Sequence, residues 1–483
     1  MNRAGFRQSG LIAYRGTILQ PVSDSVCQII GDGAVVVDAN GRVAASLPWR
    51  ELQPLAGGLD RVHGDGSALL LPAMVDNHTH ISQHLIRGRF DRGISTDDPR
   101  GSLLASLQDN VFPAEVACAD DTHAAAVVAA FAGETLAHGV VGGMTFMTVH
   151  ARAVRIALQL LPETWRVGLV LMDQNCPHEL RTNSQTLERD VSELSGEFGN
   201  RLLLADRFAV ACSSGLRQRA VGLARKFNLR TETHMNEQIA EKHAVERKLY
   251  PQYASYADVY QQDGLLGDFG SGGCVVAHCI HNRDDEWGLL SESGSGVAHC
   301  PSSNICLSSG SLDLAALRSS GCDWSICTDV GAGQSASLLA ELCAFVATHL
   351  ASAKGHRHLG VEELLMMGFY RITTGAARMA NLSGGAFAVG SMKEGDYASF
   401  GIYHPTGDKK GLGGMGNMPS NTSAGAILRS LLPLESIPSL ESAPASGLRQ
   451  WLISTVNPRV ARPAAVIFRG RPVLRSPSDG LPA

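Results

Sequence analysis

The sequence predicts an α/β fold, a (β/α)8 (TIM) barrel with a small β-sandwich domain built from both chain ends. Three observations support this prediction. Short apolar segments alternate with longer segments of helical period between about residues 70 and 385. Strand-like patterns without such helices flank this region on both sides. Polar residues that can bind metals end several of the central apolar segments, as expected at the mouth of a barrel.

The two ends of the chain carry the pattern of short antiparallel strands. Residues 10–70 alternate brief apolar runs with Gly, Asp and Asn turns, and a similar pattern returns after residue 390. We therefore expect residues 1–69 and 386–483 to form one β domain around a barrel at 70–385. Residues 405–450 are rich in Gly, Ser and Pro, which predicts a long loop or an insertion in the β domain.

The central region contains eight candidate strands. They cover residues 70–76, 140–149, 165–172, 201–210, 229–235, 273–280, 295–301 and 323–329. Helix-like stretches such as RQRAVGLARKFN separate them, which favours a closed barrel of alternating strands and helices. An open doubly wound sheet would show the same alternation, but no GxGxxG follows the first strand to indicate a dinucleotide site.

Composition limits the partners and the compartment. The chain has 483 residues, a net charge of −5 and no long basic run, so we expect no nucleic-acid partner. No apolar segment reaches the roughly 18–20 residues that span a bilayer, and the first residues lack the apolar core of a signal peptide. Eleven scattered cysteines without a CxxC pair indicate reduced thiols and no Cys-based zinc site. We therefore expect a cytoplasmic protein that does not bind membranes.

Histidines and an aspartate end five of the eight predicted strands. They are His78 and His80 on the first, His234 on the fifth, His278 on the sixth, His299 on the seventh and Asp329 on the eighth. Residues two apart in a strand point to one side, so both imidazoles of the first pair can face one ion. A set of three of these imidazoles with the one carboxylate would suit zinc, or less commonly iron. Four ligands complete such a site without His299, for which we expect a structural or substrate-side role.

Glu237 lies three residues after His234, at the turn into the next predicted helix. A carboxylate in that place can simply stabilise the helix N-terminus. It can also act as a general acid and base beside a water molecule that a metal has made more acidic. We favour the second interpretation because the same turn carries a predicted ligand.

With these residues the chain resembles the amidohydrolase superfamily, in its mononuclear deaminase branch. The resemblance implies that His78, His80, His234 and Asp329 hold one divalent metal. It further implies that Glu237 shuttles protons, that His278 positions or helps to activate the hydrolytic water, and that Asp329 contributes to catalysis. Members of this superfamily commonly form homodimers, although no residue of this chain indicates one.

Within this branch the motifs are similar to those of the guanine deaminase family. In HTHISQ, Gln83 stands where that family contacts the purine, and in DRFAVACS, Arg207 and Phe208 stand where it holds the carbonyl and the ring of guanine. Arg offers a planar donor fork to a carbonyl, and Gln offers both a donor and an acceptor. FPAE, LMDQNCP and AHCPSSNICLSSG are further similar stretches.

The expected reaction is the hydrolytic deamination of guanine to xanthine and ammonia, by attack of a metal-bound hydroxide on the amino-bearing ring carbon. A related heterocycle, such as isoxanthopterin, another pterin or 8-oxoguanine, is the alternative substrate. A triazine chlorohydrolase or another amidohydrolase is a more distant alternative, and a catalytically inactive protein on the same barrel is a third. The cytidine-deaminase-like route to guanine deamination requires PCxxC, which this sequence lacks.

Overall fold

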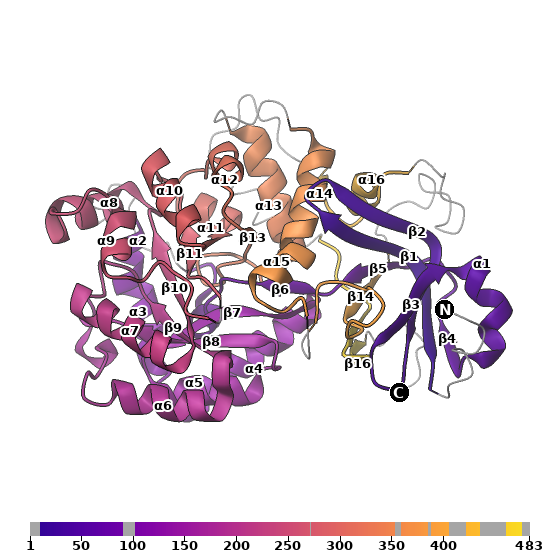
Figure 1. The fold of residues 1–483 in the computed structure, drawn as a ribbon, viewed down its shortest axis with the longest axis horizontal. Helices are drawn as coiled ribbons and strands as arrows, with labels where there is room; N and C mark the ends of the chain where they lie inside the picture. Colours follow the sequence, from indigo (N-terminus) through magenta and orange to yellow (C-terminus); the bar gives the residue numbers. More distant parts are fainter. Residues whose placement is uncertain are drawn as a thin grey trace.

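The structure of the chain is a computed structural model. It describes residues 10–89, 102–270, 272–352, 359–384, 388–404, 422–434 and 460–475. A barrel of strands surrounded by helices forms one body, and a sheet that contains both ends of the described chain forms the second body beside it (Figure 1). The predicted fold class is confirmed.

Eight strands form the barrel, and each is parallel to its neighbours. They are β6 (Met74–Asp76), β7 (Val140–Thr148), β8 (Trp165–Leu171), β9 (Leu202–Asp206), β10 (Arg230–Met235), β11 (Val275–His278), β12 (Gly296–His299) and β13 (Trp324–Ile326). They pair in sequence order from β6 to β13. At the seam between the first and the last, the amide of Asp329 donates to the carbonyl of His78 at 2.9 Å. Every residue of β7 and β8 is buried, as expected for parallel strands covered on both faces.

Helices follow the strands and cover the barrel. The longer ones are α4 (Asp121–Ala137), α5 (Ala151–Leu160), α6 (Leu187–Phe198), α7 (Ser214–Phe227), α9 (Tyr256–Gln262), α10 (Asp284–Glu292), α12 (Leu314–Ser320), α13 (Leu338–Ala351) and α14 (Val361–Ile372). Shorter ones are α2 (Ser102–Ser106), α3 (Phe112–Ala117), α8 (Ile239–His243), α11 (Pro301–Cys306) and α15 (Thr374–Met379), with η3 (Ile81–Ile86) and η4 (Leu107–Val111) near the barrel mouth. Asp or Ser side chains cap the N-termini of α4, α7, α9, α12 and α13 by accepting a backbone hydrogen bond, which fixes where these helices begin.

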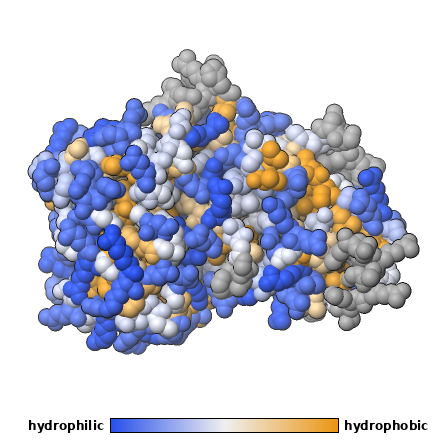
Figure 2. Space-filling view, in the orientation of Figure 1, coloured by the Kyte–Doolittle hydropathy of each residue, from blue (hydrophilic) through white to orange (hydrophobic). Residues whose placement is uncertain are grey.

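The second body is one hydrogen-bonded sheet from both ends of the chain. Its strands are β1 (Ile12–Ser23), β2 (Val26–Val37), β3 (Val43–Pro48), β4 (Arg61–His63), β5 (Leu69–Pro72), β14 (Phe400–Tyr403), β15 (Ala465–Phe468) and β16 (Arg471–Arg475). Alternate residues build an apolar cluster on each face: Tyr14 and Ile18 belong to one, Leu11 and Ala13 to the other. Helix α1 (Trp49–Leu52) packs on the second cluster through Leu52. Hydrophobic side chains also gather on the surface near the β1–β2 hairpin (Figure 2), where Val22 and Val26 are exposed.

The first predicted barrel strand, residues 70–76, is divided between the two bodies. Leu69–Pro72 pairs with β1 and β14 in the small sheet, and only Met74–Asp76 pairs with β7 in the barrel. The backbone changes partners between neighbouring residues. The amide of Ala73 donates to Ser399 at 3.0 Å, and that of Met74 donates to Gly139 at 3.0 Å. A continuous apolar run cannot reveal this division, because both halves are buried.

Part of the predicted 405–450 insertion is described. It contains α16 (Ala424–Arg429), which packs against α14. Residues 405–421 and 435–450 lie outside the described residues. All eleven cysteines are described, and each is a free thiol. Among the described helices, none combines the length and the apolar character needed to cross a membrane.

Candidate active site

The carboxyl ends of the barrel strands bring the predicted ligands together. His78 and His80 directly follow β6, His234 lies in β10, His278 ends β11 and Asp329 follows β13. His278 and Asp329 have backbone φ angles of 72° and 45°, a left-handed conformation that non-glycine residues adopt only at a cost. The fold therefore holds these two side chains in place against local backbone preference.

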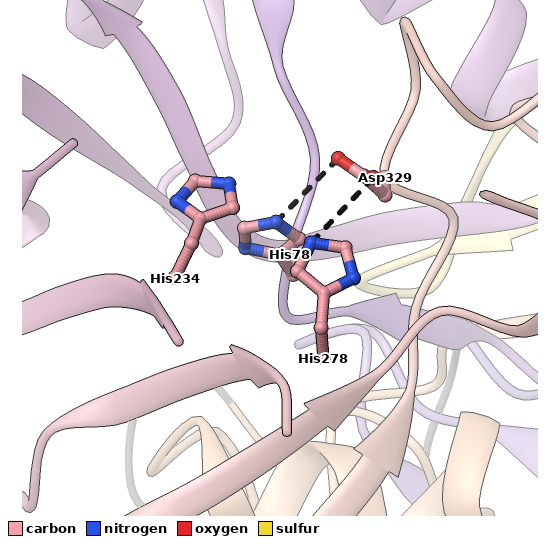
Figure 3. Close-up of side chains that lie close together, drawn as sticks. All are labelled: His78, His234, His278 and Asp329. Carbon is pink, nitrogen blue, oxygen red and sulfur yellow. Dashed lines mark ion pairs between the residues drawn. The ribbon is translucent and has the colours of Figure 1, made fainter. Parts of the chain in front are cut away.

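One set of donor atoms lies within the reach of a single metal ion. Ligand atoms of His78, His234, His278 and Asp329 all lie within 4.8 Å of one another, and all four residues are buried. Figure 3 shows the three imidazoles and the carboxylate gathered around one point. This set includes His278, which the sequence predicts to lie beside the metal, and it leaves out His80. His80 nevertheless joins the same cluster, since its Nε2 lies 3.3 Å from Nε2 of His234.

The two oxygens of Asp329 face different groups. Oδ1 lies 3.0 Å from Nε2 of His80 and 3.5 Å from Nε2 of His78. Oδ2 accepts a hydrogen bond of 2.6 Å from the Ser303 hydroxyl and lies 3.9 Å from Nε2 of His278. The carboxylate thus turns one oxygen to the HxH pair and the other to His278.

The far ring nitrogens of three imidazoles are held by oxygen acceptors. Nδ1 of His78 lies 2.7 Å from a Glu232 carboxylate oxygen, and Nδ1 of His234 lies 2.8 Å from the Arg207 carbonyl. Nδ1 of His278 lies 3.0 Å from Oδ1 of Asn304. Metal-binding histidines are commonly held in this way, because an acceptor on one nitrogen leaves the other free for the ion.

The electrostatic state of the cluster also fits a metal. Burial lowers the pKa of His80 to about 3 and that of His278 to about 4, so both rings are neutral near pH 7. Burial opposes protonation of His78 as well, but the nearby carboxylates of Asp329 and Glu232 outweigh it and raise the pKa of this ring to about 10. A metal that bound there would displace a proton.

Glu237 lies beside the cluster and is not part of the following helix. Helix α8 begins at Ile239, and it is Glu241 that accepts the backbone amides of Glu237 and Gln238. The Glu237 side chain points to the cluster instead, with Oε2 3.6 Å from Nε2 of His278. Burial, with the nearby carboxylates of Asp329 and Glu241, raises the pKa of Glu237 well above its ordinary value.

Two buried atoms of the cluster are available for a ligand. Nε2 of His78 and Oε1 of Glu237 have no hydrogen-bond partner among the described residues, and both are shielded from solvent. Buried polar atoms in native proteins are almost always paired with protein, water or an ion. A divalent cation with a water molecule would satisfy both atoms.

A cavity of about 350 Å³ opens over this cluster. Its lining residues are His80, Gln83, Leu103, Leu107, Arg207, Phe208, His234, Glu237, His278, Leu307, Asp329 and Ala332. All three predicted substrate residues therefore line the same cavity as the predicted catalytic glutamate.

Neighbouring residues hold the polar wall of this cavity. Nη1 of Arg207 donates to the buried Glu115 carboxylate at 2.6 Å. Gln83 packs on Gly331, where a Cβ atom would lie 2.3 Å from Oε1 of the glutamine. Gly331 also has φ = 124°, so only glycine fits this position without strain.

Some residues that support the site carry no motif of their own. Glu115 and Glu232 lie 92 and 154 residues from their partners Arg207 and His78. Glu232 could have been inferred from its position two residues before His234, on the same side of the strand. Glu115 belongs to FPAE, a stretch with no intrinsic chemical signature.

His299 lies away from the cavity lining. Its Nε2 lies 3.0 Å from Nε2 of His349, and its ring contacts that of Phe345. Cys279 and Cys300 are fully buried thiols, and burial raises the pKa of each well above its ordinary value.

Comparisons with known proteins agree with this geometry. The chain matches the amidohydrolase family over residues 69–411. It is 30% identical to the guanine deaminase of Rattus norvegicus over 354 residues, 70% of this chain and 74% of that one. It is 29% identical to the guanine deaminase of Escherichia coli K12 over 363 residues, 71% of this chain and 79% of that one.

A solved structure shares the fold over nearly the whole chain. The guanine deaminase from C. acetobutylicum, with guanine bound in its active site, superposes with a TM-score of 0.73 at 21% identity. The likeness covers 96% of this chain and 100% of that one. From the family match, which includes the barrel and every residue of the candidate metal cluster, we conclude that the chain belongs to the amidohydrolase family.

Proposed function

We propose that this protein is a guanine deaminase that converts guanine and water to xanthine and ammonia. One observation carries the proposal: Glu237 and the imidazole–carboxylate cluster share a single cavity with Arg207 and Gln83. Groups that move protons thus face groups that can hold the polar edge of a purine. The guanine deaminases of rat and E. coli among the relatives support the same substrate.

We propose that His78, His80, His234 and Asp329 hold one divalent ion. Oδ1 of Asp329 lies nearest to the HxH pair, whereas His278 faces Glu237 and the other oxygen. Three imidazoles and one carboxylate favour zinc, with iron as the second choice. When bound, the ion lowers the pKa of a water molecule toward neutrality and so supplies a nucleophile at neutral pH.

Glu237 is the proton carrier in this proposal. Its carboxylate takes a proton from the attacking water and delivers it to the ring nitrogen beside the amino-bearing carbon. A second proton transfer, from the added hydroxyl to the amino group, lets the C–N bond break and ammonia leave. Burial and the nearby carboxylates raise the pKa of Glu237, which favours the return of the proton from this carboxyl group to the ring. His278 orients the attacking water through Nε2, since its Nδ1 is directed to Asn304.

Arg207, Gln83 and Phe208 hold the substrate ring. Glu115 fixes one terminal nitrogen of Arg207, and this directs the remaining donors of the guanidinium to a ring carbonyl. Phe208 offers an apolar surface to the ring, and Gln83 offers a donor and an acceptor to its amide-like edge.

The decisive experiment is steady-state kinetics on the zinc-loaded protein. Guanine, isoxanthopterin, 8-oxoguanine and a chlorinated triazine are compared by absorbance and by release of ammonia or chloride. We expect ammonia release with kcat/KM highest for guanine. A higher kcat/KM for a pterin or for 8-oxoguanine would keep the chemistry and change the substrate, and chloride release without ammonia would contradict deamination.

Two further proposals concern assembly and location. We propose a homodimer, which multi-angle light scattering would test by giving twice the mass of the 51.2 kDa chain.

We also propose a cytoplasmic location, because eleven unbridged cysteines fit a reducing compartment. Recovery of the protein in an oxidising compartment would contradict it.

A further inference from the structure

Three leucines from two separate segments line the cavity of about 350 Å³ over the cluster, which we call the ring cavity. Leu103 and Leu107 lie in α2 and at the start of η4, and Leu307 follows α11. All three are buried. We call them the leucine roof. It is the apolar side of a cavity whose other residues are mostly polar.

One side chain joins the two segments of the roof. Oε1 of Gln238 accepts the amide of Leu103 at 3.1 Å. Its Nε2 donates to the carbonyl of Leu307 at 3.0 Å and to the hydroxyl of Ser309 at 3.2 Å. The side-chain amide of Gln238 therefore uses its acceptor and both donors to connect the two segments, and the residue itself is buried.

The roof also separates the ring cavity from a second cavity. Leu107 and Phe208 line both the ring cavity and an adjoining cavity of about 1040 Å³. Most of the residues that line the second cavity are apolar, and Gln108, Asn175 and Lys248 are its polar members. Leu107 is thus part of the wall between the cavity over the cluster and a roomier cavity beside it.

We propose that Gln238 fastens the leucine roof over the substrate and that Leu107 limits the substrate to a bicyclic ring without a bulky substituent. This inference rests on the proposed function for the identity of the ring. Gln238 is a positioning residue in this scheme, because it acts through Leu103 and Leu307. A fastened roof keeps water from the ring and leaves the polar groups of the cavity in a medium of low dielectric constant.

The roof itself is tested without turnover. Hydrogen–deuterium exchange of the zinc-loaded protein is compared for wild type, Q238M and the control Q262M, whose glutamine donates to Asp258 on the surface. Methionine keeps the volume of Gln238 and removes its hydrogen bonds. We expect faster exchange at 103–111 and 307–309 in Q238M alone, with β7 unchanged. Unchanged exchange in these two segments would overturn the fastening role.

The limit on substituents is tested by selectivity. The ratio of kcat/KM for 7-methylguanine and for 9-methylguanine to that for guanine is measured in wild type, L107A and the control L160A, an exposed leucine. We expect L107A to raise at least one ratio by about tenfold or more, the effect of a methylene-sized change in a hydrophobic pocket. Unchanged ratios would overturn the role of Leu107.

The exchange experiment and the selectivity experiment together distinguish a failure of this inference from a failure of the proposed function. If wild type turned over no guanine, the deaminase proposal would fail, whereas the exchange arm would still decide whether Gln238 fastens the roof. Binding of xanthine and 9-methylxanthine, measured by calorimetry, would then replace the kinetic ratios, and equal discrimination by wild type and L107A would again count against Leu107.

Discussion

Single side chains of the cavity have separable tasks. Glu237 faces the cluster without helping to bind the ion in our proposal, whereas Arg207 faces the ring. Substitutions at these two positions should therefore alter different kinetic constants.

Replacing Glu237 with Gln should abolish proton transfer and leave the ion in place. Gln keeps the shape of the side chain, but it cannot carry a proton between water and ring. We expect kcat to fall by about 10²- to 10⁴-fold, the usual contribution of a general acid and base. Metal content measured by mass spectrometry should stay at one ion per chain. Full activity in E237Q would exclude this residue from the reaction.

Replacing Arg207 with Lys should weaken substrate binding more than it slows catalysis. Lys keeps the positive charge but loses the planar fork that contacts Glu115 and the ring together. We expect KM for guanine to rise by about 10- to 100-fold, which matches the 1.5–3 kcal/mol of a hydrogen bond to a charged group. R152K, at an exposed arginine, is the control. An unchanged KM would place the substrate elsewhere.

At the scale of elements, the turn η3 carries Gln83 and is anchored to α4. The guanidinium of Arg87 binds both carboxylate oxygens of Glu134, and His84 lies 3.2 Å from the same carboxylate. Burial disfavours the ionised carboxylate, but these hydrogen bonds outweigh it and lower the pKa of Glu134 to about 2. The anchor holds the turn on which the predicted substrate glutamine lies.

Because the folded pKa of Glu134 lies below its ordinary value, its contribution to stability is complete above about pH 5 and is lost as the pH falls toward 2. We expect E134Q to lower the free energy of unfolding by about 1–3 kcal/mol at pH 7 and by less at pH 3. Denaturant titrations at both pH values measure this, with E188Q at an exposed carboxylate as the control. A difference that grew toward pH 3 would contradict the anchor.

Much of the barrel and the cluster follows from the sequence, because alternating apolar runs and residues at strand ends are local patterns. That His78, His234 and Asp329 lie in one cluster could be predicted in this way, since the carboxyl ends of barrel strands converge. The respective places of His80 and His278 could not be read from spacing, since both rings reach the same cluster. The split between β5 and β6 and the contact of Glu115 with Arg207 depend on tertiary pairing, which periodicity does not encode. The domain boundaries at residues 69 and 385 stay a prediction.

At the scale of the whole molecule, the metal should connect distant parts of the barrel. His78 follows the first strand and Asp329 the last, so an ion bound by both would close the seam of the barrel. We expect removal of the ion by a chelator to lower the melting temperature and abolish activity, and zinc to restore both. Calorimetry with and without chelator measures the shift. H78A should melt near the temperature of the metal-free wild type, and an unaltered melting temperature after chelation would argue against a bound ion.

The change of partners at Ala73 has a consequence for any attempt to divide this protein. Only four residues lie between Ala73, which makes the last small-sheet contact, and His78, and three of them form the barrel strand β6. Severing the chain there would leave a free amino terminus, with its positive charge, within a few residues of the proposed metal ligand His78. The barrel therefore cannot be separated from the small sheet at this point without disturbing the site. A chimera that takes its small sheet from a relative should fold only when residues 69–80 are kept from the same protein as the barrel.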